Sequence, residues 1–103
     1  PSNLLVNSDC LLAIADFGMA RCVTAPPDNY TETAKMMTLY VATRWYRAPE
    51  ILFSAPHYDT KADLWSAGCI FAEMIIQRQI FPGKDLVSQV KMIVTILGTP
   101  DER

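Results

Sequence analysis

Residues 37–52 read MTLYVATRWYRAPEIL, a stretch that places two phosphorylatable hydroxyls just before two arginines. Thr38 and Tyr40 lie one residue apart, and Arg44 and Arg47 follow them. A phosphate on either hydroxyl would add about −1.5 to −2 charges and three acceptor oxygens, which guanidinium groups bind well. Taken alone, the stretch is compatible with a phosphorylation switch, but a surface hydroxyl beside solvated arginines is the default interpretation. The rest of the sequence has to decide between them.

The composition is that of a globular chain. Of the 103 residues, 50% are hydrophobic and 19% charged, and the net charge is −2, so we expect a hydrophobic core. The chain has no run of like charge, which argues against a nucleic-acid groove or a polybasic membrane patch. Its most apolar stretch, 64–76, is shorter than the about 20 residues needed to span a bilayer. The start, PSNLLV, has no initiator methionine or signal peptide, and we expect a fragment.

The cysteines indicate neither a disulfide framework nor a zinc site. Cys10, Cys22 and Cys69 are odd in number and form no CxxC pair. This usage fits a reducing compartment, and we expect buried free thiols.

The N-terminal half predicts a hairpin followed by a long loop. Two short apolar runs, 3–6 and 11–15, are separated by the turn formers Asn7, Ser8 and Asp9. Residues 16–47 then show neither helical nor strand periodicity, and loops of this length are commonly functional or disordered.

The C-terminal half predicts helices. Pro49 can begin a short helix through Phe53, and Thr60 with Asp63 suggests a capping box for a helix over 60–76. That helix is apolar nearly all round, so its large side chains should face several neighbours: Leu64, Trp65, Ile70, Phe71 and Met74. A last helix over 85–97 ends at Gly98, with one apolar face made of Leu86, Val87, Val90, Ile93, Val94 and Leu97.

The hairpin predicts a metal site. Asn3 precedes the first strand and Asp16-Phe17-Gly18 follows the second, so an amide oxygen and a carboxylate should meet at one end. Oxygen ligands that leave positions for water and phosphate suit Mg²⁺, whereas zinc favours histidine or cysteine. An aspartate at a strand end is more often an ordinary turn residue, so this motif is weak by itself.

Several longer sequence motifs, which occur in a fixed order, are more specific evidence than the Asp16-Phe17-Gly18 motif alone. They are DFGMAR (16–21), YVATRWYRAPEIL (40–52), KADLWSAGCIFAEM (61–74) and FPGKD with LGTP (81–85 and 97–100). Together with Asn3, they resemble the signature set of a eukaryotic protein kinase, and more narrowly a mitogen-activated protein kinase (MAP kinase). DFGMAR leans towards the large MAP kinase branch. The resemblance covers the whole chain and implies a partial α+β protein kinase-like fold, a mainly helical C-lobe with a small β-hairpin before an activation segment at 16–50. It also implies that the N-lobe and the end of the C-lobe lie outside these residues.

The resemblance implies a role for each matching residue. Asn3 and Asp16 are similar to the residues that bind Mg²⁺ and, through it, ATP. Thr43 is similar to the threonine that bonds the catalytic aspartate and lysine, and 41–47 to the pocket for the residue after the phosphoacceptor, which this family prefers as proline. Structural roles are implied for Phe17, which packs to set Asp16, and for Gly18, Glu50 and Asp63.

The opening stretch gains its interpretation from the same resemblance. Thr38 and Tyr40 match the T-x-Y phosphosites, Arg21 matches the receiver of phosphothreonine, and Arg44 and Arg47 match receivers of phosphotyrosine. Leu39 departs from the glutamate, proline or glycine usual between the phosphosites.

The implied parent is a proline-directed Ser/Thr kinase that uses ATP and Mg²⁺ in the cytoplasm and nucleus. Its expected partners are protein substrates with Ser/Thr-Pro, a dual-specificity MAP kinase kinase and phosphatases, with no nucleic acid and no membrane. The catalytic aspartate of the family lies five residues before Asn3, so the fragment alone should be inactive. The competing interpretation is a non-catalytic kinase-fold binding module, such as a pseudokinase or truncated isoform.

Overall fold

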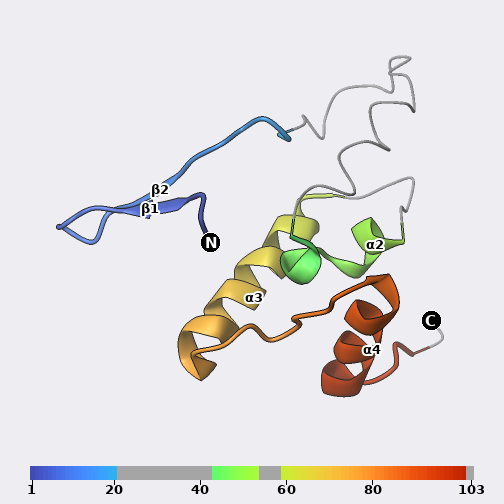
Figure 1. Ribbon diagram of the computed structural model, residues 1–103. Coiled ribbons are helices and arrows are strands. Elements are labelled where there is room, and N and C mark those ends of the chain that lie inside the picture. The colour runs from blue at the N-terminus through green and yellow to red at the C-terminus, as the bar shows by residue number, and fades with distance from the viewer. Residues whose placement is uncertain (21–42, 54–58, 102–103) are drawn as a thin grey trace, which may run out of the picture.

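The computed structural model describes residues 1–20, 43–53 and 59–101. Within these ranges the chain forms β1 (Leu4–Val6), β2 (Leu12–Ile14), the 3-10 helix η1 (Arg44–Tyr46), α2 (Pro49–Leu52), α3 (Lys61–Ile76) and α4 (Leu86–Leu97). Figure 1 shows the two strands as a ribbon apart from a group made of η1 and the helices. The small sheet and the helical remainder agree with the α+β composition that the sequence predicts.

The strands form the predicted hairpin. They pair antiparallel, with Leu4 opposite Ile14 and Val6 opposite Leu12. The turn is organised by Asn7, whose Oδ1 accepts hydrogen bonds from the backbone N–H groups of Asp9 (3.0 Å) and Leu11 (2.8 Å). Cys10 takes a positive φ of 60° in this turn and is exposed, so the expectation of buried thiols is wrong for this residue. The short connection between the two strands, residues 7–11, leaves its side chains no core to enter.

The helix α3 begins without the predicted capping box. Thr60 already has helical angles (φ −59°, ψ −14°) and its side chain makes no cap. An N-cap hydroxyl reaches the first turn only from extended backbone, which explains the error. Asp59 takes over instead, because its Oδ1 accepts from the Lys61 N–H at 2.7 Å.

The helix α4 carries the capping box. Asp85 is extended, its Oδ1 accepts from the Ser88 N–H (2.7 Å), and Ser88 Oγ accepts from the Asp85 N–H (3.0 Å). The predicted apolar face is correct only in part: Ile93 is buried, but Val87 is 77% exposed, and the fully buried side chain of the helix is Gln89. The face of α4 that is buried is therefore turned about the helix axis relative to the face that the apolar residues predict.

The core is small and lies between α2, α3, α4 and the segment before α4. Its buried members are Leu52, Cys69, Phe81 and Ile93, with Tyr46, Trp65, Ile80 and Met92 packed against them. Trp65 stacks on Phe81, with ring centroids 5.8 Å apart. The opposite side of α3 is not covered by the described residues, since Leu64, Phe71 and Met74 are each about two-thirds exposed or more.

Candidate functional site

The hairpin brings Asn3 and Asp16 to the same end. The Ala15 N–H donates to the backbone carbonyl of Asn3 at 2.8 Å, which continues the strand pairing one step beyond Leu4 and Ile14. Asp16 follows directly. Both side chains belong to exposed residues, so their oxygens are accessible to a ligand from solvent.

Asp16 has an unusual backbone for a residue with a side chain. Its φ is 66°, in the left-handed region, and its Oδ1 accepts from the Gly18 N–H at 3.1 Å. A Cβ added at Gly18 would lie 3.1 Å from the same Oδ1, so the carboxylate fits closely against glycine. Phe17, expected to pack and set Asp16, is 72% exposed in the described structure.

The donor set at this end fits Mg²⁺. One amide oxygen and one carboxylate are hard ligands, and Mg²⁺ in nucleotide sites typically takes one or two carboxylates together with phosphates and water. Among the described residues, no group of three or more histidine, cysteine, aspartate or glutamate side chains could hold a metal ion. Asn3 and Asp16 would thus supply two ligands, with the remainder coming from the nucleotide and solvent.

A second group of site residues is on and beside η1. Thr43 is exposed and directly precedes η1, while Arg44 and Arg47 are half-buried at its two ends. Burial lowers the pKa of Arg47, and the nearby charge of Arg44 lowers it further. Two guanidinium groups whose charges act on each other favour an anion nearby. Arg21, Thr38 and Tyr40 lie outside the described residues.

The two remaining predicted site residues, Glu50 and Asp63, lie in the first turns of helices. Glu50 is half-buried in the first turn of α2, and Asp63 is exposed in the first turn of α3. Both positions suit a carboxylate, because the N-terminus of a helix carries partial positive charge.

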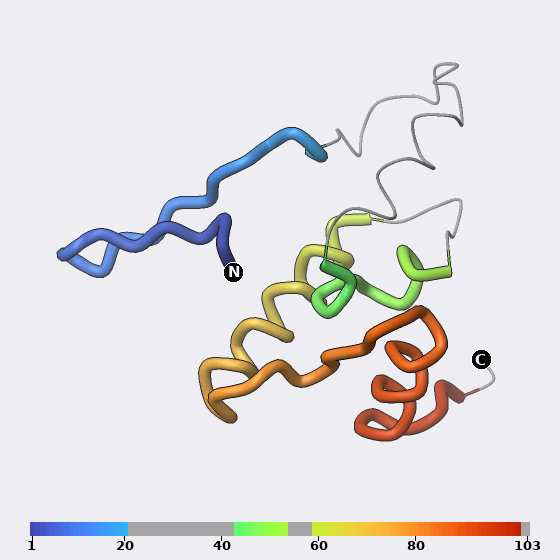
Figure 2. The backbone as a smooth tube through the Cα atoms, viewed as in Figure 1, coloured from blue at the N-terminus to red at the C-terminus, as the bar shows by residue number. Residues whose placement is uncertain are grey.

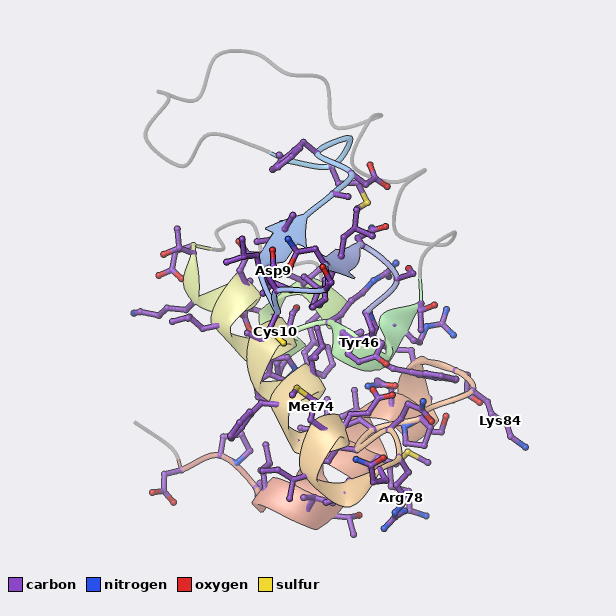
Figure 3. All side chains as sticks on the ribbon, turned by 90° about the vertical axis from the view of Figure 1, so that its left-hand side faces the viewer. Asp9, Cys10, Tyr46, Met74, Arg78 and Lys84 are labelled. Carbon is purple, nitrogen blue, oxygen red and sulfur yellow. The ribbon has the colours of Figure 1, made fainter. Side chains whose placement is uncertain are left out.

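The segment around η1 is tied to α3 by contacts that sequence reasoning missed. Tyr46 Oη donates to Glu73 Oε2 at 2.6 Å, and Gln79 Nε2 donates to Glu73 Oε1 at 2.9 Å. Ser66 Oγ donates to the Tyr46 carbonyl at 2.6 Å. Burial and the Glu73 carboxylate together raise the pKa of Tyr46 to about 12. Figure 3 shows the half-buried Tyr46 near α3.

The protein kinase domain family matches residues 1–101. The chain belongs to the protein kinase domain family. Within it, the resemblance to MAP kinases is confirmed by identity over nearly the whole chain. The chain is 57% identical over 100 residues to the mitogen-activated protein kinase spk1 of Schizosaccharomyces pombe and 51% identical over 100 residues to the mitogen-activated protein kinase KSS1 of Saccharomyces cerevisiae. It is 50% identical over 101 residues to mitogen-activated protein kinase 5 of Arabidopsis thaliana.

These alignments cover 97% to 98% of this chain but only 25% to 27% of each relative. The chain therefore spans about a quarter of the length of the relatives it matches. In the described part of this kinase chain, no helix is long and apolar enough to cross a membrane.

A cavity in the described part of the chain is separate from these site residues. It has a volume of about 210 Å³ and is lined by Trp65, Gly68, Cys69, Ile80, Phe81 and Leu97. Four of the residues that line it belong to the core cluster or pack against it, while Gly68 and Leu97 are exposed. Burial raises the pKa of the Cys69 thiol. The buried free thiol expected from sequence is thus found at Cys69, in contrast to Cys10.

Proposed function

We propose that the chain is part of the C-lobe of a MAP kinase that transfers the γ-phosphate of ATP to serine or threonine before proline. The observation that carries this proposal is the meeting of Asn3 and Asp16 at one end of the hairpin, in a chain matched by the protein kinase domain over residues 1–101. A signature motif alone gives order in sequence, whereas the strand pairing that brings the backbones of Asn3 and Ala15 together supports a shared role for Asn3 and Asp16. Residues 16–50 are then the activation segment.

The residues of this chain supply nucleotide positioning. Asn3 and Asp16 would hold Mg²⁺, which would neutralise phosphate charge during transfer. The Gly18 N–H fixes one carboxylate oxygen of Asp16 and so orients the other. Thr43, exposed beside η1, would bond the catalytic aspartate and lysine of the complete protein.

Regulation follows from phosphorylation of Thr38 and Tyr40, with Arg21, Arg44 and Arg47 as receivers. Hydrogen bonds to charged groups contribute about 1.5–3 kcal/mol each. Fixing the backbone costs on the order of 1–2 kcal/mol per residue. A few phosphate contacts therefore could not order a long segment from coil, but they could select between two compact arrangements. A dual-specificity MAP kinase kinase would add the phosphates and phosphatases would remove them, in the cytoplasm and nucleus.

The test is the activity of the complete protein that contains this chain. Phosphate transfer to Ser-Pro and Thr-Pro peptides is measured with Mg²⁺ and ATP, before and after treatment with a dual-specificity MAP kinase kinase. We expect strong activation that the double variant Thr38→Ala, Tyr40→Phe loses. The double variant Tyr30→Phe, Thr31→Ala removes the same two hydroxyl types from an earlier part of the segment and should behave as the unsubstituted protein. Absence of transfer in every form would instead favour a non-catalytic kinase-fold binding module.

The metal assignment has its own test. Asp16→Asn removes the negative ligand and keeps the size of the side chain, so it should weaken Mg²⁺-dependent binding of ATP. Direct binding of a fluorescent ATP analogue, with and without Mg²⁺, measures this without requiring turnover. Equal Mg²⁺ dependence in Asp16→Asn and the unsubstituted protein would contradict the assignment.

A further inference from the structure

The segment between α3 and α4 returns past η1 and holds it through backbone carbonyls. Figure 2 shows the chain running back from the end of α3 and passing the 44–48 stretch before it enters α4. Trp45 Nε1 donates to the Gly83 carbonyl at 2.9 Å, and Arg44 Nη1 donates to the Lys84 carbonyl at 3.1 Å. Two neighbouring side chains of η1 are thus fixed on two neighbouring peptide groups, 38 and 40 residues away in sequence.

Gly83 is itself held by α4. Gln89 is fully buried, and its Oε1 accepts from the Gly83 N–H at 3.1 Å. The same N–H points across a tight turn to the Phe81 carbonyl at 2.9 Å, so it is shared between two acceptors. A Cβ at Gly83 would lie 2.5 Å from Gln89 Oε1 and 2.6 Å from Gln89 Cα, which real side chains do not tolerate. The loop backbone therefore lies directly against the first turn of α4, and only glycine permits this approach.

Gln89 is a costly choice for a purely structural position. Its Nε2 is buried without a hydrogen-bond partner in the described structure. An unsatisfied buried donor costs free energy, whereas an apolar side chain of similar size would avoid that cost. What the amide provides in return is the acceptor for Gly83, whose carbonyl in turn holds Trp45.

We propose that Gln89 is a positioning residue for the protein substrate. It fixes the Gly83 peptide, and through Gly83 the α3–α4 loop sets the place of residues 43–47. This inference rests on the proposed function and on the family resemblance, which implies that residues 41–47 form the pocket for the residue after the phosphoacceptor. Gln89 acts on peptide binding through Gly83 and Trp45, and touches neither ATP nor the transferred phosphate.

The experiment uses the complete, dually phosphorylated protein. Gln89→Met keeps a side chain of similar length and removes the acceptor together with the unpartnered donor. We expect the KM for a Ser-Pro peptide to rise about three- to tenfold, the range for one shared neutral hydrogen bond, while the KM for ATP stays unchanged. Gly83→Ala should raise the peptide KM at least as much. Lys91→Ala, on the exposed side of the same helix, is the matched control and should change neither.

The melting temperature of Gln89→Met distinguishes a positioning role of Gln89 from a role in packing alone. A position that only packs would show unchanged KM values in Gln89→Met and at most a smaller folded fraction, which lowers the apparent kcat. We expect the melting temperature of Gln89→Met to equal or exceed that of the unsubstituted protein while the peptide KM rises. An unchanged peptide KM in both variants, or an equal rise in the KM for ATP, would overturn the proposal.

A readout independent of turnover distinguishes failure of this inference from failure of the kinase proposal. Amide hydrogen exchange over residues 44–48 should be faster in Gln89→Met than in the unsubstituted protein and in Lys91→Ala. If the protein transfers no phosphate but exchange is faster, the proposed function fails and the positioning of η1 stands. Unchanged exchange over 44–48 overturns the positioning role with or without activity.

Discussion

Replacing Tyr46 with phenylalanine should test the contact that joins η1 to α3. The phenol donates to Glu73 Oε2 at 2.6 Å, a short bond to a charged acceptor. The substitution removes only the hydroxyl group. The ring can still pack against the core, and Ser66 Oγ can still donate to the backbone carbonyl of residue 46. Glu73 would keep its bond from Gln79 and lose the one from the phenol.

The expected cost is about 1.5 kcal/mol. A hydrogen bond to a charged group contributes about 1.5–3 kcal/mol, and half-burial of Tyr46 and Glu73 points to the lower end, since water can partly replace the phenol. The pKa of Tyr46, raised to about 12, adds a dependence on pH. Because the folded pKa is above the usual value of about 10, the contribution is complete below pH 10 and is lost as pH rises through about 12. Tyr46→Phe should lack this alkaline loss.

Denaturant unfolding of the complete protein measures the effect through a double-mutant cycle. The second substitution is Glu73→Met, which has similar length and no acceptor oxygen, and the cycle isolates the term shared by the two residues. We expect a coupling of about 1 kcal/mol or more. A coupling near zero, or a Tyr46→Phe variant whose stability changes with alkaline pH as the unsubstituted protein does, would refute the reasoning.

Three further outcomes are expected. Gly98→Ala should destabilise by about 1–3 kcal/mol in thermal unfolding, because φ is 86° there although a Cβ would meet no neighbour; a neutral result would contradict the strain. Hydrogen bonds from Ser88 hold the pKa of Asp85 below its usual value, so this stabilisation is lost as pH falls below about 4, and Asp85→Asn should reduce that acid-dependent loss in melting curves. Brief alkylation followed by mass spectrometry should label the exposed Cys10 before the buried Cys69, and the reverse order would show that the core is open.

Local signals explain what the sequence predicted correctly. The turn at 7–10 is set by Asn7, whose side chain bonds its own backbone neighbours within four residues. Pro49 begins α2 because its missing N–H is not needed in a first turn, and Gly98 ends α4 because its φ is positive. Each of these features depends on residues adjacent in sequence, so a sequence pattern contains the information.

The contacts that sequence reasoning missed are long-range. The Tyr46–Glu73 pair is separated by 27 residues and the Trp45–Gly83 pair by 38. No spacing pattern in the sequence predicts either hydrogen bond. Gln89 reads as an ordinary polar position among the apolar residues of α4, yet it is the fully buried one. The close approach of Gly83 accounts for this burial, since the loop backbone lies directly against Gln89 and covers it.

The structural contact of Arg44 is compatible with the receiver role proposed for it. A guanidinium carries five N–H donors in a fixed fork, and the Lys84 carbonyl uses Nη1. The remaining donors suffice for a phosphate, so the anchor on the α3–α4 loop and the proposed receiver role are compatible. An arginine already fixed by one backbone contact loses less conformational entropy when it binds a phosphate than a freely rotating one would. The loop that positions η1 would therefore also prepare its guanidinium for a negatively charged ligand, so that substrate positioning and phosphate recognition share the same short segment of backbone.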